Sequence, residues 1–408
     1  MKAEINPSAS LRKRCSAELS RIRSEHSRTI KNLREVANRI LKAVQSKEKI
    51  ILYGDADPDG IASVIVLKES LEQLEARIVR VYFPDREKEG YGINEKALKI
   101  LSKYSPALFI TLDCGVGNVK EVKMAKDMGF EVLIIDHHKM LPEVPEASLI
   151  CNPRQRGDKY PFKELATAGI VYKLSKVLFS SIGKGFRPEK FLELVAIATL
   201  ADQMALRDEN EKLVREGILA LDFTKREGLK SLMKINQFKN FNLSEVRQKI
   251  ISPLNSGLTK NHLNETYLLL IEKDSEESQK KAKNLIKRAK IRKEEIKRVT
   301  KEIEERIDES QKIIFEGDKT WPLILLGPAA SRICQKYIKP VFLFKKGQEE
   351  SAGAVRVPSN MDGVKAMIGC HQLLKTYGGH PPAAGFRIKN QNLIKFKECL
   401  IKYFKLYL

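Results

Sequence analysis

Short apolar runs alternate with longer segments of helical periodicity between Lys49 and residue 151. The expected strands are Ile50–Tyr53, Ile78–Phe83, Ala107–Leu112, Val132–Ile135 and Ser148–Cys151. Helical spacing appears between most of them, near Ile61–Leu74, Asn94–Leu101 and Val119–Met128. Strands that alternate with helices form a parallel sheet with helices on both faces. The pattern therefore predicts an α/β fold for this part of the chain.

The pattern changes twice further along the chain. A mostly helical region runs from Leu165 to about Phe238, and Ser275–Gln311 reads as one long charged helix with a thin apolar stripe. After Gly317 a second α/β pattern follows, with the runs PLILLG, KPVFLF, SAGAVRV and TYGGHPPAAGF. We expect two lobes joined by a spacer helix. The proposed divisions are 1–45, 46–240, 241–312 and 313–408.

The N-terminal segment, residues 8–45, is basic and also helical in pattern. Its apolar stripe follows steps of three, four or seven residues through Cys15, Leu19, Ile22, His26, Leu33, Ile40 and Val44. Such a stripe predicts a coiled coil, as in a homo-oligomer, or a helix that docks on a helicase or replication protein. The alternative is a helix packed on its own domain.

The charge of the chain changes the picture of its partners. Lysine and arginine number 74 and acidic residues 52, which gives a formal net charge of +22. This excess favours a polyanion, either nucleic acid or an anionic membrane surface. A Lys/Glu-rich, heat-adapted surface would explain many charges but not their imbalance.

Cysteines and apolar segments indicate the compartment. None of the six cysteines forms a C-x-x-C pair, so we expect neither a zinc ribbon nor a disulfide framework. The N-terminus lacks the apolar core of a signal peptide, and no segment has the length of a membrane span. The sequence predicts a soluble cytoplasmic protein with reduced thiols and no membrane association.

Three carboxylates at alternate positions, Asp55, Asp57 and Asp59, follow the first predicted strand in GDADPDG. An EF-hand calcium loop has the same opening, but it needs Glu at its twelfth position, where this chain has Val66. That loop also follows a helix, whereas the acids here follow a strand. The carboxyl end of such a strand is where open α/β sheets bind their ligands.

Two more predicted strands end on similar residues. Asp113 follows one, and Asp136, His137 and His138 follow the next, while Asp202 ends the apolar helical run VAIATLA. Mixed carboxylate and imidazole ligands suit manganese and, less closely, magnesium. Several acids with few histidines imply two cations that share a carboxylate, an arrangement that hydrolyses phosphate esters. With the basic charge, the pattern points to nucleic acid as the substrate.

These residues resemble a known family. GDADPDG, LDCG, IDHH and ATLADQMALRDEN are similar, in order and spacing, to the four motifs of the DHH phosphoesterases. GGHPPAAGF, GPAASRICQKYIKPV and AGAVR resemble the DHH-associated domain that follows in that family. RecJ exonucleases and their archaeal relatives have the nearest pattern. The resemblance spans about residues 49–386 and implies a metal site on the first lobe and substrate binding on the second.

The resemblance implies a role for each motif residue. Asp55 (where many relatives have His), Asp57 and Asp59 would be metal ligands, Asp113 would bridge both metals, and Asp202 would complete the second metal's shell. His137 would be a ligand with Asp136 behind it, and His138 would face the scissile phosphate. In the second lobe, Gly378, Gly379 and His380 would line a phosphate-binding turn and Arg356 would hold another phosphate. Relatives often have Ser at the position of Ala354.

The function expected from this resemblance is a metal-dependent exonuclease of single-stranded nucleic acid in repair or replication, with DNA as the expected substrate and RNA as the alternative one. One alternative is a phosphodiesterase of short oligonucleotides or cyclic dinucleotides. An alternative of another class is a non-catalytic subunit of a replication complex. That role would require the loss of metal ligands, whereas every expected acid and histidine is present here.

Overall fold

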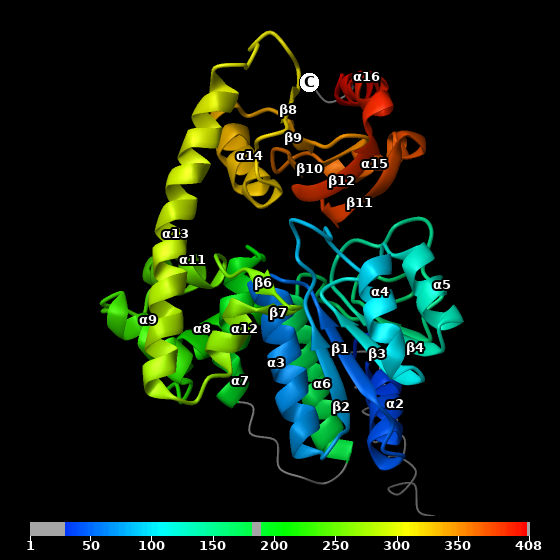
Figure 1. Ribbon diagram of the computed structural model, residues 1–408, viewed down its shortest axis with the longest axis vertical. Coiled ribbons are helices and arrows are strands. Elements are labelled where there is room, and N and C mark those ends of the chain that lie inside the picture. The colour runs from blue at the N-terminus through cyan, green and yellow to red at the C-terminus, as the bar shows by residue number, and fades with distance from the viewer. Residues whose placement is uncertain (1–28, 182–188, 406–408) are drawn as a thin grey trace, which may run out of the picture.

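The computed structural model describes residues 29–181 and 189–405. Two lobes, each built around its own five-stranded sheet, lie one above the other in Figure 1. The long helix α13 (Ser275–Glu304) runs along one side of the molecule from the lower lobe to the upper one. The two α/β lobes and the helix between them agree with the fold class expected from the sequence.

The lower sheet is entirely parallel, with the strand order β2-β1-β3-β4-β5. Its strands are β1 (Ile50–Gly54), β2 (Ile78–Tyr82), β3 (Ala107–Leu112), β4 (Phe130–Ile135) and β5 (Leu149–Cys151). All five strands expected here are therefore present, with ends shifted by at most two residues. The direction of winding reverses between β1 and β3, and such a point opens a crevice at the carboxyl ends of the strands.

Helices cover both faces of this sheet because the strands are apolar on both sides. Ile50 and Leu52 of β1 pack into one core, while Ile51 and Tyr53 pack into another. The first core is closed by α2 (Leu33–Gln45), α3 (Pro58–Gln73) and α6 (Thr167–Ser181), and the second by α4 (Glu95–Leu101) and α5 (Val119–Asp127). Period-two alternation in a strand with two buried faces produces this division.

The first core continues well beyond the sheet. Leu229, Tyr267 and Leu285 are buried in it together with the sheet residues. They lie on α9 (Glu227–Ile235), α12 (Glu265–Leu270) and α13. The remaining elements of this region are α7 (Glu189–Ala201), α8 (Asp208–Asp222), α10 (Leu243–Glu245), the π-helical η2 (Val246–Ile251), α11 (Ser252–Leu254) and the hairpin formed by β6 (Thr259–Lys260) and β7 (Leu263–Asn264). The proposed division at residue 240 thus separates segments that share one core, and it stays a proposal.

The part of the N-terminal apolar stripe that lies on α2 packs inside the first core of the lower lobe. Val36, Ala37 and Ile40 of α2 are fully buried in the first core. Docking or coiled-coil pairing through this part of the stripe is therefore wrong, and the alternative of a helix packed on its own domain is confirmed for Leu33–Gln45. The positions Cys15, Leu19, Ile22 and His26 lie outside the described residues.

Substitution in α2 should consequently destabilise the fold. Ile40→Ala removes a fully buried side chain from the first core, and we expect the free energy of unfolding to fall by about 2–5 kcal/mol. Urea denaturation followed by circular dichroism measures this change. Lys42→Ala, on the exposed side of the same helix, should change it by less than about 0.5 kcal/mol. Equal stability of the parent and Ile40→Ala would contradict the packing of α2.

The upper sheet is mixed, with the order β11-β12-β10-β9-β8. Only β8 and β9 are parallel. Its elements are β8 (Ile314–Asp318), β9 (Val341–Lys346), β10 (Glu350–Arg356), β11 (Leu374–His380) and β12 (Ala383–Lys389). The run PLILLG is not a strand but the start of helix α14 (Leu323–Tyr337), and the first strand of this lobe is IFEGD.

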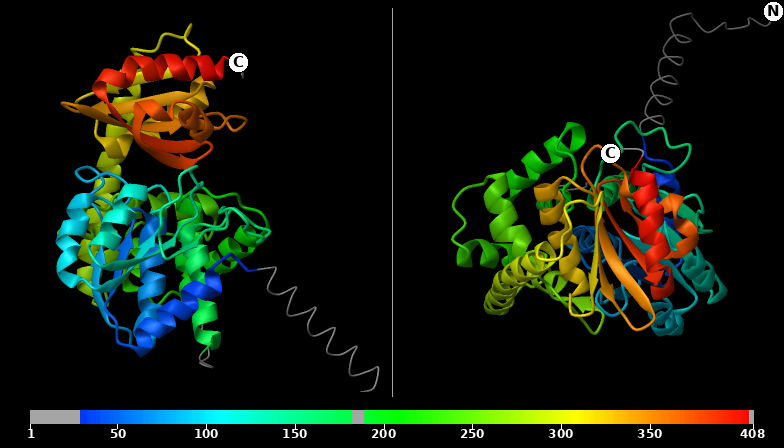
Figure 2. Two further views of the ribbon diagram at one scale, coloured as in Figure 1. Left: turned by 90° about the vertical axis from the view of Figure 1, so that its right-hand side faces the viewer. Right: turned by 90° about the horizontal axis from the view of Figure 1, so that it is seen from above.

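Each face of the upper sheet has its own helices. Phenylalanines of the sheet pack with α15 (Gly363–Gly369) and α16 (Leu393–Phe404) on one face, and α16 lies at the end of the molecule away from the lower lobe (Figure 2). The other core contains Trp321, residues of α14 and the last turns of α13. Helix α13 thus packs in both lobes, and it ends at Glu304 rather than Gln311.

The structure bears on two expectations from the sequence, one about the thiols and one about membrane-spanning segments. Cys370 and Cys399 form a disulfide between α15 and α16, which contradicts the expectation that all thiols are reduced. Their separation of 29 residues along the chain gave no sign of this pairing. Within residues 29–181 and 189–405, we find no helix with the length and apolarity that a bilayer crossing requires.

Candidate metal centre

A cleft of about 2090 Å³ separates the two lobes. Its floor consists of the loops that follow β1, β2, β3 and β4, and the β11–β12 hairpin reaches into it from the upper lobe. The carboxyl ends of the parallel strands therefore face the cleft, as the doubly wound topology requires. Every candidate residue of the four lower motifs lies on this floor or directly beneath it.

The carboxylates of the three acids in GDADPDG make different contacts. Asp57 caps α3, and its Oδ1 accepts hydrogen bonds from the N–H groups of Asp59 and Gly60, both at 3.0 Å. The Asp59 carboxylate accepts from the N–H groups of Thr167 and Ala168 at the start of α6, both at 2.8 Å. Gly60 is required here, because a Cβ would lie 2.4 Å from the Asp55 carbonyl oxygen.

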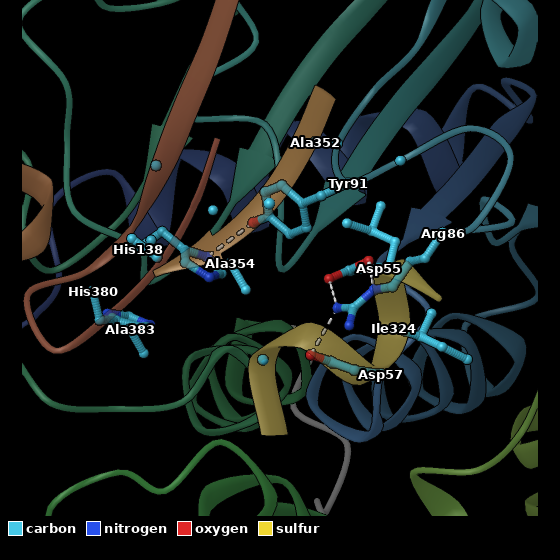
Figure 3. Close-up of a pocket in the computed structure, with 18 of the residues that line it drawn as sticks. Asp55, Asp57, Arg86, Tyr91, His138, Ile324, Ala352, Ala354, His380 and Ala383 are labelled. Atoms are coloured by element: carbon cyan, nitrogen blue, oxygen red, sulfur yellow. Dashed lines mark hydrogen bonds and ion pairs between the residues drawn. The ribbon is translucent and has the colours of Figure 1, made fainter. Parts of the chain in front are cut away.

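Arg86 contacts the other three carboxylate oxygens of Asp55 and Asp57. Its Nε donates to Asp55 Oδ1 at 2.9 Å, and its Nη2 contacts both Asp55 Oδ2 and, at 2.9 Å, Asp57 Oδ2. Figure 3 shows the guanidinium lying between the two carboxylates. Burial raises the pKa of Asp55 despite this partner. Burial also acts to raise the pKa of Asp57, but the charge of Arg86 and the hydrogen bonds from Gly60 and Arg86 together outweigh it and lower that pKa.

His137 lies at the centre of the remaining acids. Its Nε2 is 3.3 Å from Asp113 Oδ1, 3.4 Å from Asp202 Oδ2 and 3.7 Å from Asp59 Oδ2. These ligand-type atoms come from β3, α7, α3 and β4, whose ends the fold brings together. Asp113 also belongs to the group formed with Asp55 and Asp57, so its carboxylate lies between two clusters of candidate ligands. This is the position expected of a bridging carboxylate.

The hydrogen bonds of His137 determine which nitrogen carries its proton. Nδ1 lies 3.0 Å from the Leu165 carbonyl oxygen, which can only accept, so Nδ1 carries the proton and Nε2 presents a lone pair. Within the described residues, neither His137 Nε2 nor Asp202 Oδ2 has a hydrogen-bond partner, although both are buried. A lone pair surrounded by carboxylate oxygens fits a cation as its missing partner.

The pKa values of the acids also indicate that this site is completed by a cation. Burial and then the charge of neighbouring acids raise the pKa of Asp113 and Asp59 well above the usual range of a carboxyl. Burial and Asp57 raise the pKa of Asp202 to about 7. Burial and the neighbouring His138 lower the pKa of His137 to about 3, which keeps its ring neutral. Divalent cations would offset this repulsion and hold all the carboxylates ionised.

Asp136 contacts the ring of His138 rather than that of His137. Its Oδ1 accepts from His138 Nδ1 at 2.7 Å, and it contacts His137 only through the backbone N–H. The expectation that Asp136 stands behind His137 is therefore wrong; the Leu165 carbonyl holds that ring instead. Burial lowers the pKa of His138, but Asp136 outweighs burial and raises it to about 9. Burial likewise raises the pKa of Asp136, and His138 outweighs it and lowers the pKa to about 2.

His380, which comes from the second lobe, lies beside the same cluster of side chains. The His380 ring stacks on His138 with centroids 4.7 Å apart, and its Nε2 is 3.7 Å from Asp202 Oδ2. Both of its ring nitrogens are buried and have no partner among the described residues. His380 was expected to contact phosphate alone, but the structure places it beside the candidate metal ligands as well.

The glycines of this motif end a strand rather than form a turn. Gly378 and Gly379 belong to β11, and the prolines after His380 make the turn into β12. Gly379 has a φ of 130°, and a Cβ there would lie 2.6 Å from the Ala383 carbonyl oxygen. A Cβ on Gly378 would meet nothing within 4 Å, so the backbone there borders open cleft. That opening leaves room for a ligand to approach the peptide groups.

Arg356, the other second-lobe candidate, also lines the cleft. Its Nη1 donates to the Val355 carbonyl oxygen at 2.8 Å. Burial lowers its pKa, while Asp202 across the cleft raises it. Arg356 thus brings a buried positive charge to the upper side of the site.

Sequence reasoning missed two residues of the site, Arg86 and Tyr91. The Tyr91 hydroxyl donates to the Asp113 carbonyl oxygen at 3.0 Å and lies 3.2 Å from His138 Nδ1 (Figure 3). Both residues follow β2, where the acids of PDREKEG alternate with basic residues and no histidine accompanies them. The rule that parallel strands place ligands at their carboxyl ends would have included this loop.

Comparison with known proteins finds similarity over the same part of the chain. Residues 49–199 match the N-terminal domain of the DHH family. The single-stranded-DNA-specific exonuclease RecJ of Bacillus subtilis is 33% identical over 371 residues, which cover 89% of this chain and 46% of the relative. The chain spans about half the length of the curated relatives it matches first.

Two solved structures extend the likeness to three dimensions. An exonuclease RecJ bound to manganese superposes with a TM-score of 0.74 at 27% identity, over 92% of this chain and 95% of that one. RecJ of Thermus thermophilus in complex with Mn²⁺ superposes with a TM-score of 0.77 at 26% identity, over 92% and 55% of the two chains.

Proposed function

We propose that this chain, which matches the N-terminal domain of the DHH family over residues 49–199 and is similar to RecJ exonucleases over most of its length, is a metal-dependent exonuclease of single-stranded nucleic acid, with DNA as its main substrate. The observation that carries this proposal is the partnerless Nε2 of His137, directed at three carboxylates. A hydrolase that works with divalent cations uses such a centre, whereas a purely structural core would leave no lone pair of this kind unpaired.

Two groups of residues would hold the cations. Asp59, Asp113 and His137 form one group, with Asp202 beside it, and Asp55, Asp57 and Asp113 form the other. Manganese suits this mixture of oxygen and imidazole ligands, and magnesium suits its oxygens. Bound there, two cations stabilise the attacking and the leaving oxygen of phosphodiester hydrolysis.

Other side chains would position the substrate. His138 is held through Nδ1 by Asp136 and Tyr91, which leaves Nε2 for a phosphate oxygen at the scissile bond. Arg86 would exchange its carboxylate partners for a substrate phosphate once cations neutralise Asp55 and Asp57. Arg356 and the open backbone at Gly378 would hold the strand from the upper lobe.

The cleft and the charge of the chain support a long single-stranded substrate. The strand would lie between the two lobes, where bases and backbone are both within reach of side chains. The net charge of +22 favours a polyanion over a small phosphate ester. A protein partner, either a helicase or a second copy of the chain, stays a proposal that rests only on the apolar spacing of residues 8–32.

End-labelled strands test the proposal directly. Single- and double-stranded DNA and single-stranded RNA, long and short, would be incubated with Mn²⁺ or Mg²⁺ and the products sized on gels. We expect progressive shortening of single-stranded DNA that requires the cation and stops with a chelator. Cleavage confined to dinucleotides or cyclic dinucleotides would favour the small-substrate alternative. No cleavage of any substrate with either cation would favour the non-catalytic one.

Arg356 provides a further prediction. Phosphate contacts give affinity without sequence preference and appear in the salt dependence of binding. Arg356→Ala should weaken the binding of all single strands alike and flatten the slope of log K against log salt by about 0.7. Fluorescence anisotropy over a salt series measures this, with the metal content determined in parallel. An unchanged slope with unchanged affinity would remove Arg356 from the substrate path.

A further inference from the structure

The middle of α13 faces the cleft instead of a core. Its buried residues lie in the first turns, up to Ile286, and in the last turns, from Ile296 onward. Between them Arg288, Ile291 and Arg292 line the cleft. A role as a spacer between the lobes would not explain why these arginines of α13 face the cleft.

Helix α14 presents one complete face to the same side of the cleft. Its lining residues include Ile324, Gly327, Ser331, Gln335 and Ile338. They are spaced by three or four residues, so they form a single stripe along the helix. The middle of α13 and this stripe together form a wall, called here the α13–α14 wall, which begins beside the metal centre at Ile324 and Arg86 (Figure 3).

Arg292, like Arg356 and Arg387, lines the cleft without an ion pair to any described carboxylate, whereas other arginines of the cleft have acidic partners. Arg288 pairs with Glu265, Arg154 with Glu164, and Arg86 with Asp55 and Asp57. Arg292 donates only to backbone carbonyl oxygens, that of Ile324 at 3.2 Å and that of Asn255, and no ion pair joins it to any described carboxylate.

Burial makes this missing partner significant. Arg292 Nε is buried and has no hydrogen-bond partner among the described residues. Burial, and then the charge of Arg86, lowers the pKa of Arg292, so the guanidinium lies in a site that disfavours its charge. Arg292 as a whole is half-buried, and a half-buried cation that only carbonyls contact is stabilised when an anion arrives; a guanidinium fits phosphate oxygens closely.

The surroundings of Arg292 suit a strand better than a free anion. Ile291, Leu258 and Ile338 line the cleft with large exposed aliphatic side chains. Ile338 does so in a left-handed conformation, with a φ of 52°, which β-branched residues rarely adopt. Exposed apolar side chains in the cleft that Arg292 lines offer contacts for bases, beside the contact that Arg292 offers to the backbone.

We propose that Arg292 binds a backbone phosphate of the single strand away from the scissile bond, and that the α13–α14 wall is thereby part of the substrate path. The inference rests on the proposed function and adds a subsite to it. Arg356 and Arg86 hold the strand at the metal centre, whereas Arg292 engages only strands that extend along the wall. Its contribution should therefore depend on strand length.

Binding to a catalytically silent protein tests the subsite. In an Asp113→Ala background, the affinity for a dinucleotide and for single-stranded DNA of about 12 nucleotides would be measured over a salt series. We expect Arg292→Ala and Arg292→Gln to weaken binding of the longer strand about tenfold more than that of the dinucleotide. The slope of log K against log salt should flatten by about 0.7 for the longer strand. Arg292→Lys, which keeps the charge, should retain most of the affinity.

Two further comparisons separate this subsite from a structural clip between α13 and α14. Arg298→Ala removes an arginine from the same helix that pairs with Glu302 and does not line the cleft, so it should bind like the parent. Glutamine at 292 can still donate to the carbonyls of Ile324 and Asn255. If Arg292→Gln binds the longer strand like the parent, or loses both strands equally, the subsite is overturned. Failure of the parent itself to bind or cleave any strand would overturn the proposed function together with the subsite.

Discussion

Replacing Asp113 with alanine is expected to lower the rate of strand cleavage by about a thousandfold or more. Asp113 is the one acid that belongs to both groups of candidate ligands, and it lies 3.3 Å from the lone pair of His137. Its loss would weaken both cation sites together, whereas loss of an acid from one group would weaken mainly that group. Single-turnover cleavage of labelled single-stranded DNA with saturating Mn²⁺ measures the effect.

The matched control for this prediction is Asp127→Ala. Asp127 is an exposed acid at the end of α5 in the same lobe, so this variant should cleave like the parent. Circular dichroism and metal analysis by mass spectrometry would accompany both variants. If Asp113→Ala is folded and its rate lies within about tenfold of the parent, a difference of about 1.4 kcal/mol at the barrier, the assignment of the metal centre is wrong.

The second large effect separates the two adjacent histidines. His137 directs its free nitrogen at the carboxylates, so His137→Ala should lower the affinity for metal by at least about 100-fold and abolish cleavage through that loss. His138 is held by Asp136 at 2.7 Å, so His138→Ala should retain the metals and lose turnover by about 100-fold or more. Metal content and turnover would be measured for both variants, with the exposed His371→Ala as control.

Asp136 extends this test. Because Asp136 contacts the ring of His138 and not that of His137, Asp136→Asn should resemble His138→Ala in keeping the metals while losing turnover. Equal loss of metal in the His137 and His138 variants would contradict this division of roles. A loss of metal in Asp136→Asn as large as in His137→Ala would restore the arrangement first expected from the sequence.

The parallel sheet explains why so much of the site could be predicted. Asp113 and His137 are 24 positions apart, yet they were expected to meet because their strands end at the same edge. The role of Asp136 could not be predicted in this way. Where a strand ends, the order of neighbouring residues does not determine which side chain turns toward which, and the carbonyl of Leu165 decided the orientation of His137.

Other differences have similar physical causes. The apolar stripe of α2 indicates that the helix covers an apolar surface but not whose surface, and Ile40 is buried within its own lobe. Arg86 lies in a loop of alternating acidic and basic residues, and only folding brings it to Asp55 and Asp57. Arg292 lies within the segment expected to be one long charged helix, and periodicity cannot show that the second lobe forms a cleft beside it.

The packing of α13 in two cores also has a consequence for the order of events at the ribosome. The core of the first lobe includes Leu285 and Ile286, so it is incomplete until this part of the chain has emerged from the exit tunnel. The same helix then supplies Ile296, Val299 and Ile303 to the second lobe. Domains generally fold in the order of their synthesis. Here the last helix of the earlier unit is also the first of the later one, so completion of the first lobe prepares the surface on which the nascent second lobe assembles.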